Sequence, residues 1–190
     1  MDRNIPVRKT YACKCQISSK IRAHIPKQFQ EVNLTDLGYS KLELIEKWFQ
    51  VSDPGMFISG VAGVGKTHIA CAIIRALIVV GQEVRFAEAA DFYRELRMSF
   101  NTDASEVGIV EKYATVQWLA LDDFGAGAIS DFERRYALEL LNLRMANNRR
   151  TIVTSNLDLE QIREVMDERL CSRLSSFTQL RLTGRDRRKQ

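Results

Sequence analysis

The sequence lacks a long hydrophobic run. Its longest apolar stretch, Ile73 to Val80, is interrupted by Arg75 and is much shorter than the ~20 residues of a membrane-spanning helix. The N-terminus is polar and basic and has no apolar signal region, so secretion is not expected. Cysteine is also scarce: four residues in a chain of 190 indicate free thiols or a metal site rather than a disulfide framework. These absences favour a cytoplasmic protein that does not associate with a membrane.

The composition is that of an ordinary globular protein, with 45% hydrophobic and 27% charged residues, and the length suits one domain with a substantial core. Charge is distributed unevenly. Residues 1–30 carry seven Lys or Arg and one acidic residue, whereas the other 160 residues carry 21 basic and 23 acidic ones. Residues 185–189 turn basic again. Basic ends on a near-neutral body predict contact with nucleic-acid phosphates or an acidic partner, and solvated tails that aid solubility are the alternative.

Residues 1–30 show no helical or strand periodicity over a useful length, so no regular element is predicted there. Cys13 and Cys15, with His24 nearby, resemble half of a zinc site. A structural zinc ion commonly takes its ligands as two such pairs, and the sequence offers no second pair. We therefore expect the two cysteines to be inert surface residues, with zinc binding as the alternative.

A phosphate-binding loop is the strongest motif. Residues Gly60 to Thr67 read GVAGVGKT and fit G-x-x-x-x-G-K-[ST]. Glycines allow backbone turns in which successive N–H groups converge on phosphate oxygens, while Lys66 is expected to reach the β- and γ-phosphates and the Thr67 hydroxyl to ligate Mg²⁺. A strand predicted over 56–59 and a helix over 68–80 give the motif the setting that it requires. The predicted nucleotide-binding residues are Gly60, Val61, Ala62, Gly63, Val64, Gly65, Lys66, Thr67 and His68.

Strands alternate with helices after residue 55, which predicts a parallel sheet with helices on both faces. The expected fold is therefore α/β, a three-layer α/β/α sandwich of the P-loop NTPase type with a five-stranded parallel sheet. The predicted strands are 56–59, 83–86, 116–121, 151–154 and 177–182, and the predicted helices are 41–49, 68–80, 91–100, 107–113, 130–145 and 159–174.

Polar side chains follow two of the predicted strands. Asp122 and Asp123 end an apolar strand, where a P-loop enzyme completes its Mg²⁺ site. Asp122 is expected to hold the metal, and Asp123 to orient and polarise the attacking water. Asn156 follows the next strand and is placed to bond the γ-phosphate or the attacking water. The alternatives are a helix cap or turn for the aspartates, and an N-cap for Asn156 that Asp158 could equally supply.

Two arginines form the last candidate. The segment DERLCSRL places Arg169 and Arg173 one helical turn apart on one face of a helix. Pairing with carboxylates on the surface is one interpretation. The other is an arginine supplied in trans to the γ-phosphate bound by a neighbouring subunit.

Four motifs in this order, with the short tail TGRDRR, resemble the DnaC/IstB group of AAA+ ATPases, which are bacterial and phage replicative helicase loaders and related transposition ATPases. The motifs are GVAGVGKTHIACAI, LALDDFGA, TIVTSN and DERLCSRL, and the resemblance covers about residues 25–190. The resemblance implies a role for each matching position. The matching residues are Lys66 and Thr67 (Walker A), Asp122 and Asp123 (Walker B), Asn156 (sensor 1), and Arg173 with its neighbour Arg169 (arginine finger).

The same resemblance implies ATP and Mg²⁺ as cofactors, ATP-driven assembly into an open spiral, and binding of single-stranded DNA and of a hexameric replicative DNA helicase. The chain also departs from it. Residues 1–30 resemble only a remnant of a helicase-binding zinc module, which predicts a basic N-terminal segment over 1–30 and an ATPase domain over 31–190. No helical lid is expected after the last strand. Asp123 stands where Glu is commoner, so slow, assembly-dependent hydrolysis is expected.

Three functions remain open from the sequence. It favours an ATP-hydrolysing DNA-replication accessory protein of the helicase-loader type. The alternatives are an IstB-like transposition helper ATPase and a nucleotide-gated binding adaptor with little turnover.

Overall fold

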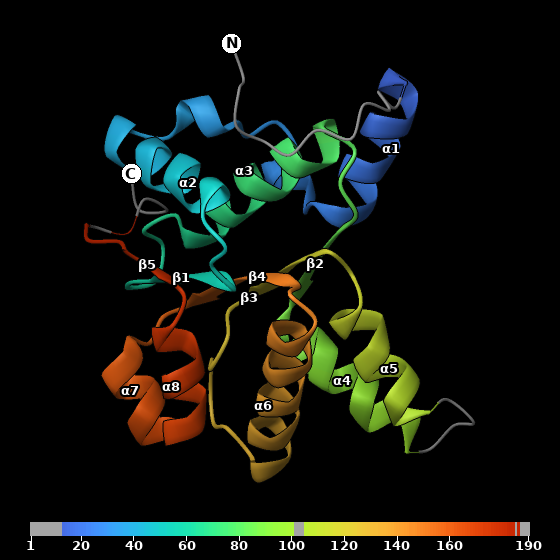
Figure 1. Cartoon of the computed structure of the whole chain (residues 1–190), viewed down its shortest axis with the longest axis vertical. Coiled ribbons are helices and arrows are strands. Elements are labelled where there is room, and N and C mark those ends of the chain that lie inside the picture. The colour runs from blue at the N-terminus through green and yellow to red at the C-terminus, as the bar shows by residue number, and fades with distance from the viewer. Residues whose placement is uncertain (1–12, 101–104, 185, 187–190) are drawn as a thin grey trace.

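A parallel β-sheet between two layers of helices forms the centre of the computed structural model, which describes residues 13–100, 105–184 and 186 (Figure 1). The strands lie in the order β2-β3-β4-β1-β5, and each pair of neighbours runs parallel. The predicted α/β fold with five parallel strands is confirmed. Part of the two basic ends lies outside the described residues, namely Arg3, Arg8, Lys9, Arg185, Arg187, Arg188 and Lys189. The strands are β1 (Gly55–Ser59), β2 (Val84–Glu88), β3 (Trp118–Asp122), β4 (Arg150–Ser155) and β5 (Thr178–Arg181).

Helices cover both faces of the sheet (Figure 1). Along β1, Met56 and Ile58 pack into the core on one face, while Phe57 packs into the core on the other, as the alternation of side chains along a strand requires. No helix within the described part of the chain is long and apolar enough to cross a membrane. The helices on one face are α1 (Lys14–His24), α2 (Tyr39–Gln50) and α3 (Lys66–Val79), and those on the other are α4 (Ala89–Ser99), α5 (Glu106–Ala114), α6 (Asp131–Ala146), α7 (Leu159–Val165) and α8 (Glu168–Ser175).

Helix α1 contradicts the prediction that residues 1–30 hold no regular element. It follows Cys13, whose side chain and backbone exchange hydrogen bonds with Gln16 in a capping box. The sequence conceals the helix because Ile21 is its one buried residue, and most of its stability comes from packing against α3 and β2. Ile21 shares a core cluster with α3. The division into two segments at residue 30 stays a prediction.

The single helix predicted over 159–174 is wrong, since α7 and α8 are separate helices. Met166 leaves the helical torsions (φ −104°, ψ −81°), and Asp167 is extended (φ −170°, ψ 143°). The Asp167 carboxylate then caps α8 by accepting a hydrogen bond from the backbone N–H of Arg169 at 2.6 Å. The sequence predicts one helix because apolar residues continue at helical spacing across this break. Asp167 is the signal against it, since aspartate favours an N-cap over a helix interior.

Cys13 and Cys15 differ from the prediction of free, inert thiols, because they form a disulfide. The other two cysteines, Cys71 and Cys171, are free and buried. Metals bind the thiolate, so neither sulfur of the pair can be a ligand while the disulfide persists. Within the described ranges, no group of three or more His, Cys, Asp or Glu residues is arranged to hold a metal ion.

A fully buried arginine fixes the two strands whose far ends carry the predicted site. Arg144, on α6, is 0% exposed. Its guanidinium donates hydrogen bonds to the carbonyls of Tyr113 at 2.6 Å, Val116 at 2.9 Å and Arg150 at 2.6 Å, and to Thr151 Oγ1 at 2.8 Å. A buried guanidinium is tolerated only when its donors are paired. These bonds tie α6 to the chain entering β3 and to the beginning of β4.

Candidate nucleotide-binding site

The loop after β1 has the backbone shape that its glycines predict. Gly60, Gly63 and Gly65 have φ values of +148°, +76° and +102°, a region that residues with a side chain rarely occupy. Gly60 also has no room for one, since an added Cβ would lie 2.4 Å from the Leu182 carbonyl oxygen. Helix α3 begins at Lys66, directly after the loop. The N-terminus of a helix attracts anions, so loop and helix together suit a phosphate chain.

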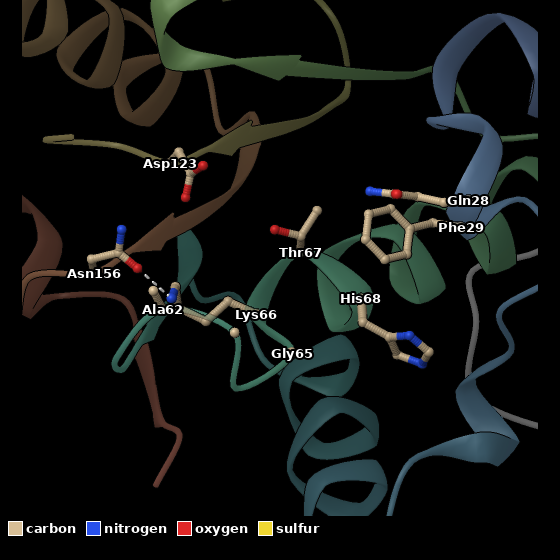
Figure 2. Close-up of a pocket in the computed structure, with 10 residues that line it drawn as sticks. Gln28, Phe29, Ala62, Gly65, Lys66, Thr67, His68, Asp123 and Asn156 are labelled. Carbon is tan, nitrogen blue, oxygen red and sulfur yellow. Dashed lines mark hydrogen bonds between the residues drawn. The ribbon is translucent and has the colours of Figure 1, made fainter. Parts of the chain in front are cut away.

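Lys66 is the first residue of α3, and its side chain points back toward the loop and the residue that follows β4. It is 5% exposed, and its Nζ donates hydrogen bonds to the carbonyls of Gly60 at 2.8 Å and Val61 at 3.0 Å. The same Nζ donates to Asn156 Oδ1 at 2.6 Å (Figure 2). The backbone N–H of Gly60 also donates to the Ser155 carbonyl at 3.3 Å. Lys66 and Asn156 are 90 residues apart in the sequence, and the fold brings them into contact.

Asp122 lies beside Thr67, as the sequence predicts. It is 4% exposed, and its carboxylate accepts hydrogen bonds from Thr67 Oγ1 at 2.9 and 3.1 Å and from Thr154 Oγ1 at 2.5 Å. Burial raises the pKa of Asp122, and the hydrogen bonds from Thr154 and Thr67 partly offset that effect. A hydroxyl and a carboxylate beside a phosphate-binding loop are the oxygen ligands that Mg²⁺ uses with substrate phosphates. These residues therefore fit Mg²⁺, whose charge would favour the ionised carboxylate.

Asp123 faces the same region as Asn156, but it lies just beyond the end of β3. Its backbone has φ +52°, which is uncommon for a residue with a side chain, and its N–H donates to Thr154 Oγ1 at 3.1 Å. Asp122 stays in β3 while the chain turns at Asp123. The two neighbouring carboxylates consequently have different surroundings, one buried against Thr67 and the other lining a cavity.

The cavity has a volume of about 590 Å³, within the range typical of small-molecule sites. Asp123 and Asn156 lie at one side of it, and Gln28 and Phe29 lie at the other (Figure 2). The Phe29 ring meets the His68 ring edge-on, with centroids 6.2 Å apart. Aromatic rings and an amide at the far side of a phosphate-binding cavity suit a planar base, which they can contact through ring faces and hydrogen bonds.

Sequence reasoning missed Gln28 and Phe29. They end the short helix η1 (Lys27–Phe29), within the segment that showed no periodicity. A phenylalanine in an otherwise polar, basic stretch was the available signal. Of the predicted loop residues, Gly60 and Val61 do not line the cavity but offer carbonyls to Lys66. Val64 packs into the core, and the loop and helix residues that do line the cavity are Ala62, Gly63, Gly65, Lys66, Thr67 and His68.

Arg169 and Arg173 are exposed on α8 and do not line this cavity. Arg169 forms an ion pair with Asp167 at 3.0 Å, which is the surface pairing considered from the sequence. Arg173 Nε donates a hydrogen bond to Asn142 Oδ1 of α6 at 2.7 Å. Their action in trans stays a prediction.

Replacing Asp122 by asparagine is expected to stabilise the protein when nucleotide and Mg²⁺ are absent. The raised pKa of Asp122 means that its ionised form is less stable in the folded state than in the unfolded chain. The ionised carboxylate therefore lowers the free energy of unfolding. This loss is absent in acid and grows as the pH rises from the pKa of the unfolded chain through that of the folded state. We expect Asp122→Asn to add about 0.5–2 kcal/mol to the free energy of unfolding at neutral pH, the usual size of a stabilising replacement, and less in acid.

Thermal unfolding in EDTA at neutral and acidic pH measures this effect. Asp131→Asn is the matched control, because the Asp131 side chain is 96% exposed and its replacement should change stability little. A melting temperature of Asp122→Asn below that of the wild-type protein at neutral pH would contradict the prediction.

Four features define this chain as an ATP-binding protein of the AAA+ class. They are the sheet order, the glycine-rich loop after β1, the buried acid at the end of β3 and the amide after β4. The chain belongs to the IstB-like ATP-binding protein family, whose model matches residues 39–175.

Two replicative helicase loaders are similar to most of this chain. The replicative helicase loader DnaC of Buchnera aphidicola subsp. Baizongia pistaciae is 26% identical over 161 residues, 82% of this chain and 65% of that protein. DnaC of Escherichia coli K12 is 26% identical over 136 residues, 71% of this chain and 56% of that protein. A crystal structure of the DnaC helicase loader shares the fold, with a TM-score of 0.73 and 21% identity over 83% of this chain and 100% of that one. The chain thus matches less than two thirds of these two DnaC proteins.

Proposed function

We propose that this chain hydrolyses ATP in a Mg²⁺-dependent reaction that is slow and requires assembly. The supporting observation is the meeting of side chains from three segments, in which Lys66 bonds Asn156 at 2.6 Å and Thr67 bonds Asp122 at 2.9 Å. Binding of a nucleotide needs little more than the loop and its lysine. Asp123 and Asn156, on the side of the cavity opposite Gln28 and Phe29, add groups suited to act on water and on the γ-phosphate.

Each of these groups has a distinct role in the proposal. Lys66 exchanges its contacts with loop carbonyls for contacts with the β- and γ-phosphates. Thr67 and Asp122 would hold Mg²⁺, which would neutralise phosphate charge. Asp123 orients the attacking water and accepts its proton, and Asn156 donates a hydrogen bond to the γ-phosphate or the water.

Arg173 is the proposed arginine finger, with Arg169 as the less favoured neighbour because it already pairs with Asp167. Among the described residues, the side chains that line the cavity include no arginine. Both arginines are exposed on α8 and so can be offered to another subunit. A finger supplied in trans makes hydrolysis depend on self-assembly.

The proposed biological role is that of a cytoplasmic DNA-replication accessory protein of the helicase-loader type. Single-stranded DNA, a replicative DNA helicase and further copies of this chain are the proposed partners. Similarity to the DnaC helicase loaders supports the helicase. Support for a nucleic acid comes from residues 13–30, which contain no acidic residue and four basic ones, Lys14, Lys20, Arg22 and Lys27.

The matching family model favours an IstB-like transposition helper as the second candidate. Pull-down of this chain with a replicative helicase and with a transposase, each in the presence of ATP, distinguishes the two roles. Retention by the helicase alone supports the loader role, and retention by the transposase alone supports the helper role.

Phosphate release under multiple turnover, with and without single-stranded DNA, tests the proposed activity. We expect slow, Mg²⁺-dependent release whose specific rate rises with protein concentration as subunits assemble. Asp123→Asn should bind ATP normally and lose release, because it keeps the loop and removes the acid. Normal ATP binding without release in either condition would contradict hydrolysis and favour a nucleotide-gated adaptor.

A further inference from the structure

The end of β4 contains buried hydroxyl groups that the proposed roles do not use. Thr154 and Ser155 directly precede Asn156, and both are 0% exposed. The Ser155 hydroxyl donates a hydrogen bond to the Phe124 carbonyl at 2.6 Å and accepts one from the Leu157 N–H at 3.0 Å. Its partners are thus backbone groups of the neighbouring turns. Thr154 differs, because its hydroxyl contacts both acidic residues.

The Thr154 hydroxyl bridges the two aspartates. It donates to Asp122 Oδ1 at 2.5 Å and accepts from the backbone N–H of Asp123 at 3.1 Å. The Thr154 carbonyl also accepts from the Phe124 N–H at 2.8 Å. A hydroxyl has one proton to donate and lone pairs with which to accept, so both of its bonds can exist at once. One residue therefore contacts the carboxylate of the first aspartate and the backbone of the second.

Both contacts lie where the regular pairing of β3 with β4 stops. The last residues paired between these two strands are Leu121 and Val153. Asp122 is still paired with Glu88 of β2 on its other side, whereas Asp123 follows the end of β3. The hydroxyls of Thr67 and Thr154 hold the Asp122 carboxylate in its rotamer. Asp123 has the uncommon φ of +52°, and such a backbone persists only when its surroundings hold it. The hydroxyl of Thr154 is a contact that can hold both.

We propose that Thr154 is a positioning residue of the hydrolysis site, which aims the Asp122 carboxylate at Mg²⁺ and sets the direction in which Asp123 leaves β3. This inference rests on the proposed Mg²⁺-dependent hydrolysis. Thr154 does not line the cavity, so it acts through the aspartates and has no direct contact with the nucleotide. It couples the metal ligand to the water-orienting acid, because one hydroxyl serves both.

Three variants of the full chain test this assignment. Thr154→Val keeps the branched shape and removes the hydroxyl, whereas Thr154→Ser keeps the hydroxyl. Thr178→Val is the matched control, because Thr178 begins β5 and is half-buried, and its hydroxyl also donates to a carboxylate, that of Asp53, at the edge of the sheet away from the cavity. Thermal unfolding confirms that each variant is folded at the temperature of the assay.

The first readout needs no hydrolysis. Affinity for a fluorescent, non-hydrolysable ATP analogue is measured in Mg²⁺ and in EDTA, and the ratio gives the gain in affinity due to the metal. For Thr154→Val we expect unchanged affinity in EDTA and a gain reduced by about 10- to 100-fold, the usual effect of removing a group that orients a metal ligand. Thr154→Ser and Thr178→Val should retain the wild-type gain. A wild-type gain in folded Thr154→Val would overturn the assignment.

The second readout is turnover. Thr154→Val should lower kcat with little change in the KM for ATP, and Thr154→Ser should restore kcat. Equal loss in Thr154→Val and Thr178→Val would instead indicate a general effect on the sheet and would overturn the proposal. Wild-type protein that shows the Mg²⁺ gain but releases no phosphate would contradict the proposed hydrolysis, and the binding ratio alone would then decide the role of Thr154 in metal binding. Wild-type protein without any Mg²⁺ gain would overturn both.

Discussion

Replacing Lys66 by alanine is expected to abolish measurable ATP binding, which corresponds to an affinity loss of at least about 100-fold. The ammonium group makes hydrogen bonds to two loop carbonyls and to Asn156 that phosphate oxygens would replace. Hydrogen bonds to charged groups contribute about 1.5–3 kcal/mol each. Losing the two bonds from Lys66 to the β- and γ-phosphates therefore weakens binding by roughly 100-fold or more. The loop would keep its N–H groups but lose the positive charge at its centre.

Equilibrium titration with a fluorescent ATP analogue and Mg²⁺ measures this loss. Lys47→Ala is the matched control, because Lys47 is exposed on α2 and pairs with Glu43 at 2.8 Å, away from the cavity. Circular dichroism shows whether each variant is folded. If folded Lys66→Ala bound the analogue as tightly as the Lys47→Ala control, the site would be misassigned.

Replacing Arg173 by alanine should leave ATP binding unchanged and lower the turnover of the assembled protein by about 1,000-fold. This is the lower end of what an arginine finger contributes to phosphoryl transfer. In the single chain, Arg173 lies outside the cavity and donates a hydrogen bond to Asn142 on the surface. Loss of that exposed contact should have little effect on stability. The expected phenotype is therefore the opposite of that of Lys66→Ala, with binding retained and hydrolysis lost.

Turnover is compared at protein concentrations where sedimentation shows that both proteins have assembled. Arg94→Ala serves as the control, because Arg94 is an exposed arginine of α4 that pairs with Asp91 at 2.6 Å. Normal hydrolysis by assembled Arg173→Ala would show that the finger is another residue or is not needed.

The elements around the loop could be predicted because their signals are local. Glycine spacing determines the turn of Gly60 to Thr67, and an apolar run of strand length precedes Asp122. Parallel strands connected by helices place their carboxyl ends at one edge of the sheet. That rule anticipates the contact of Lys66 with Asn156 and the contact of Thr67 with Asp122.

The features that the sequence concealed depend on neighbours that are distant along the chain. Helix α1 has a weak apolar face and is stabilised by α3 and β2. Phe29 becomes a cavity residue only because its segment packs beside His68. Thr154 resembles any β-branched residue of a buried strand until its hydroxyl is seen against the aspartates. Apolar residues also keep their helical spacing across Asp167, but the Asp167 carboxylate caps α8 and so begins a new helix there.

The most direct test of an active site shared between subunits mixes two inactive variants. Asp123→Asn keeps the arginine and lacks the acid, while Arg173→Ala keeps the acid and lacks the arginine. If Arg173 acts in trans, the mixture contains interfaces with both groups, and hydrolysis should return although neither protein alone is active. Arg173→Ala mixed with the double variant Asp123→Asn/Arg173→Ala should stay inactive. A mixture of the two single variants that assembles normally but hydrolyses no more ATP than the sum of its separate components would contradict the account.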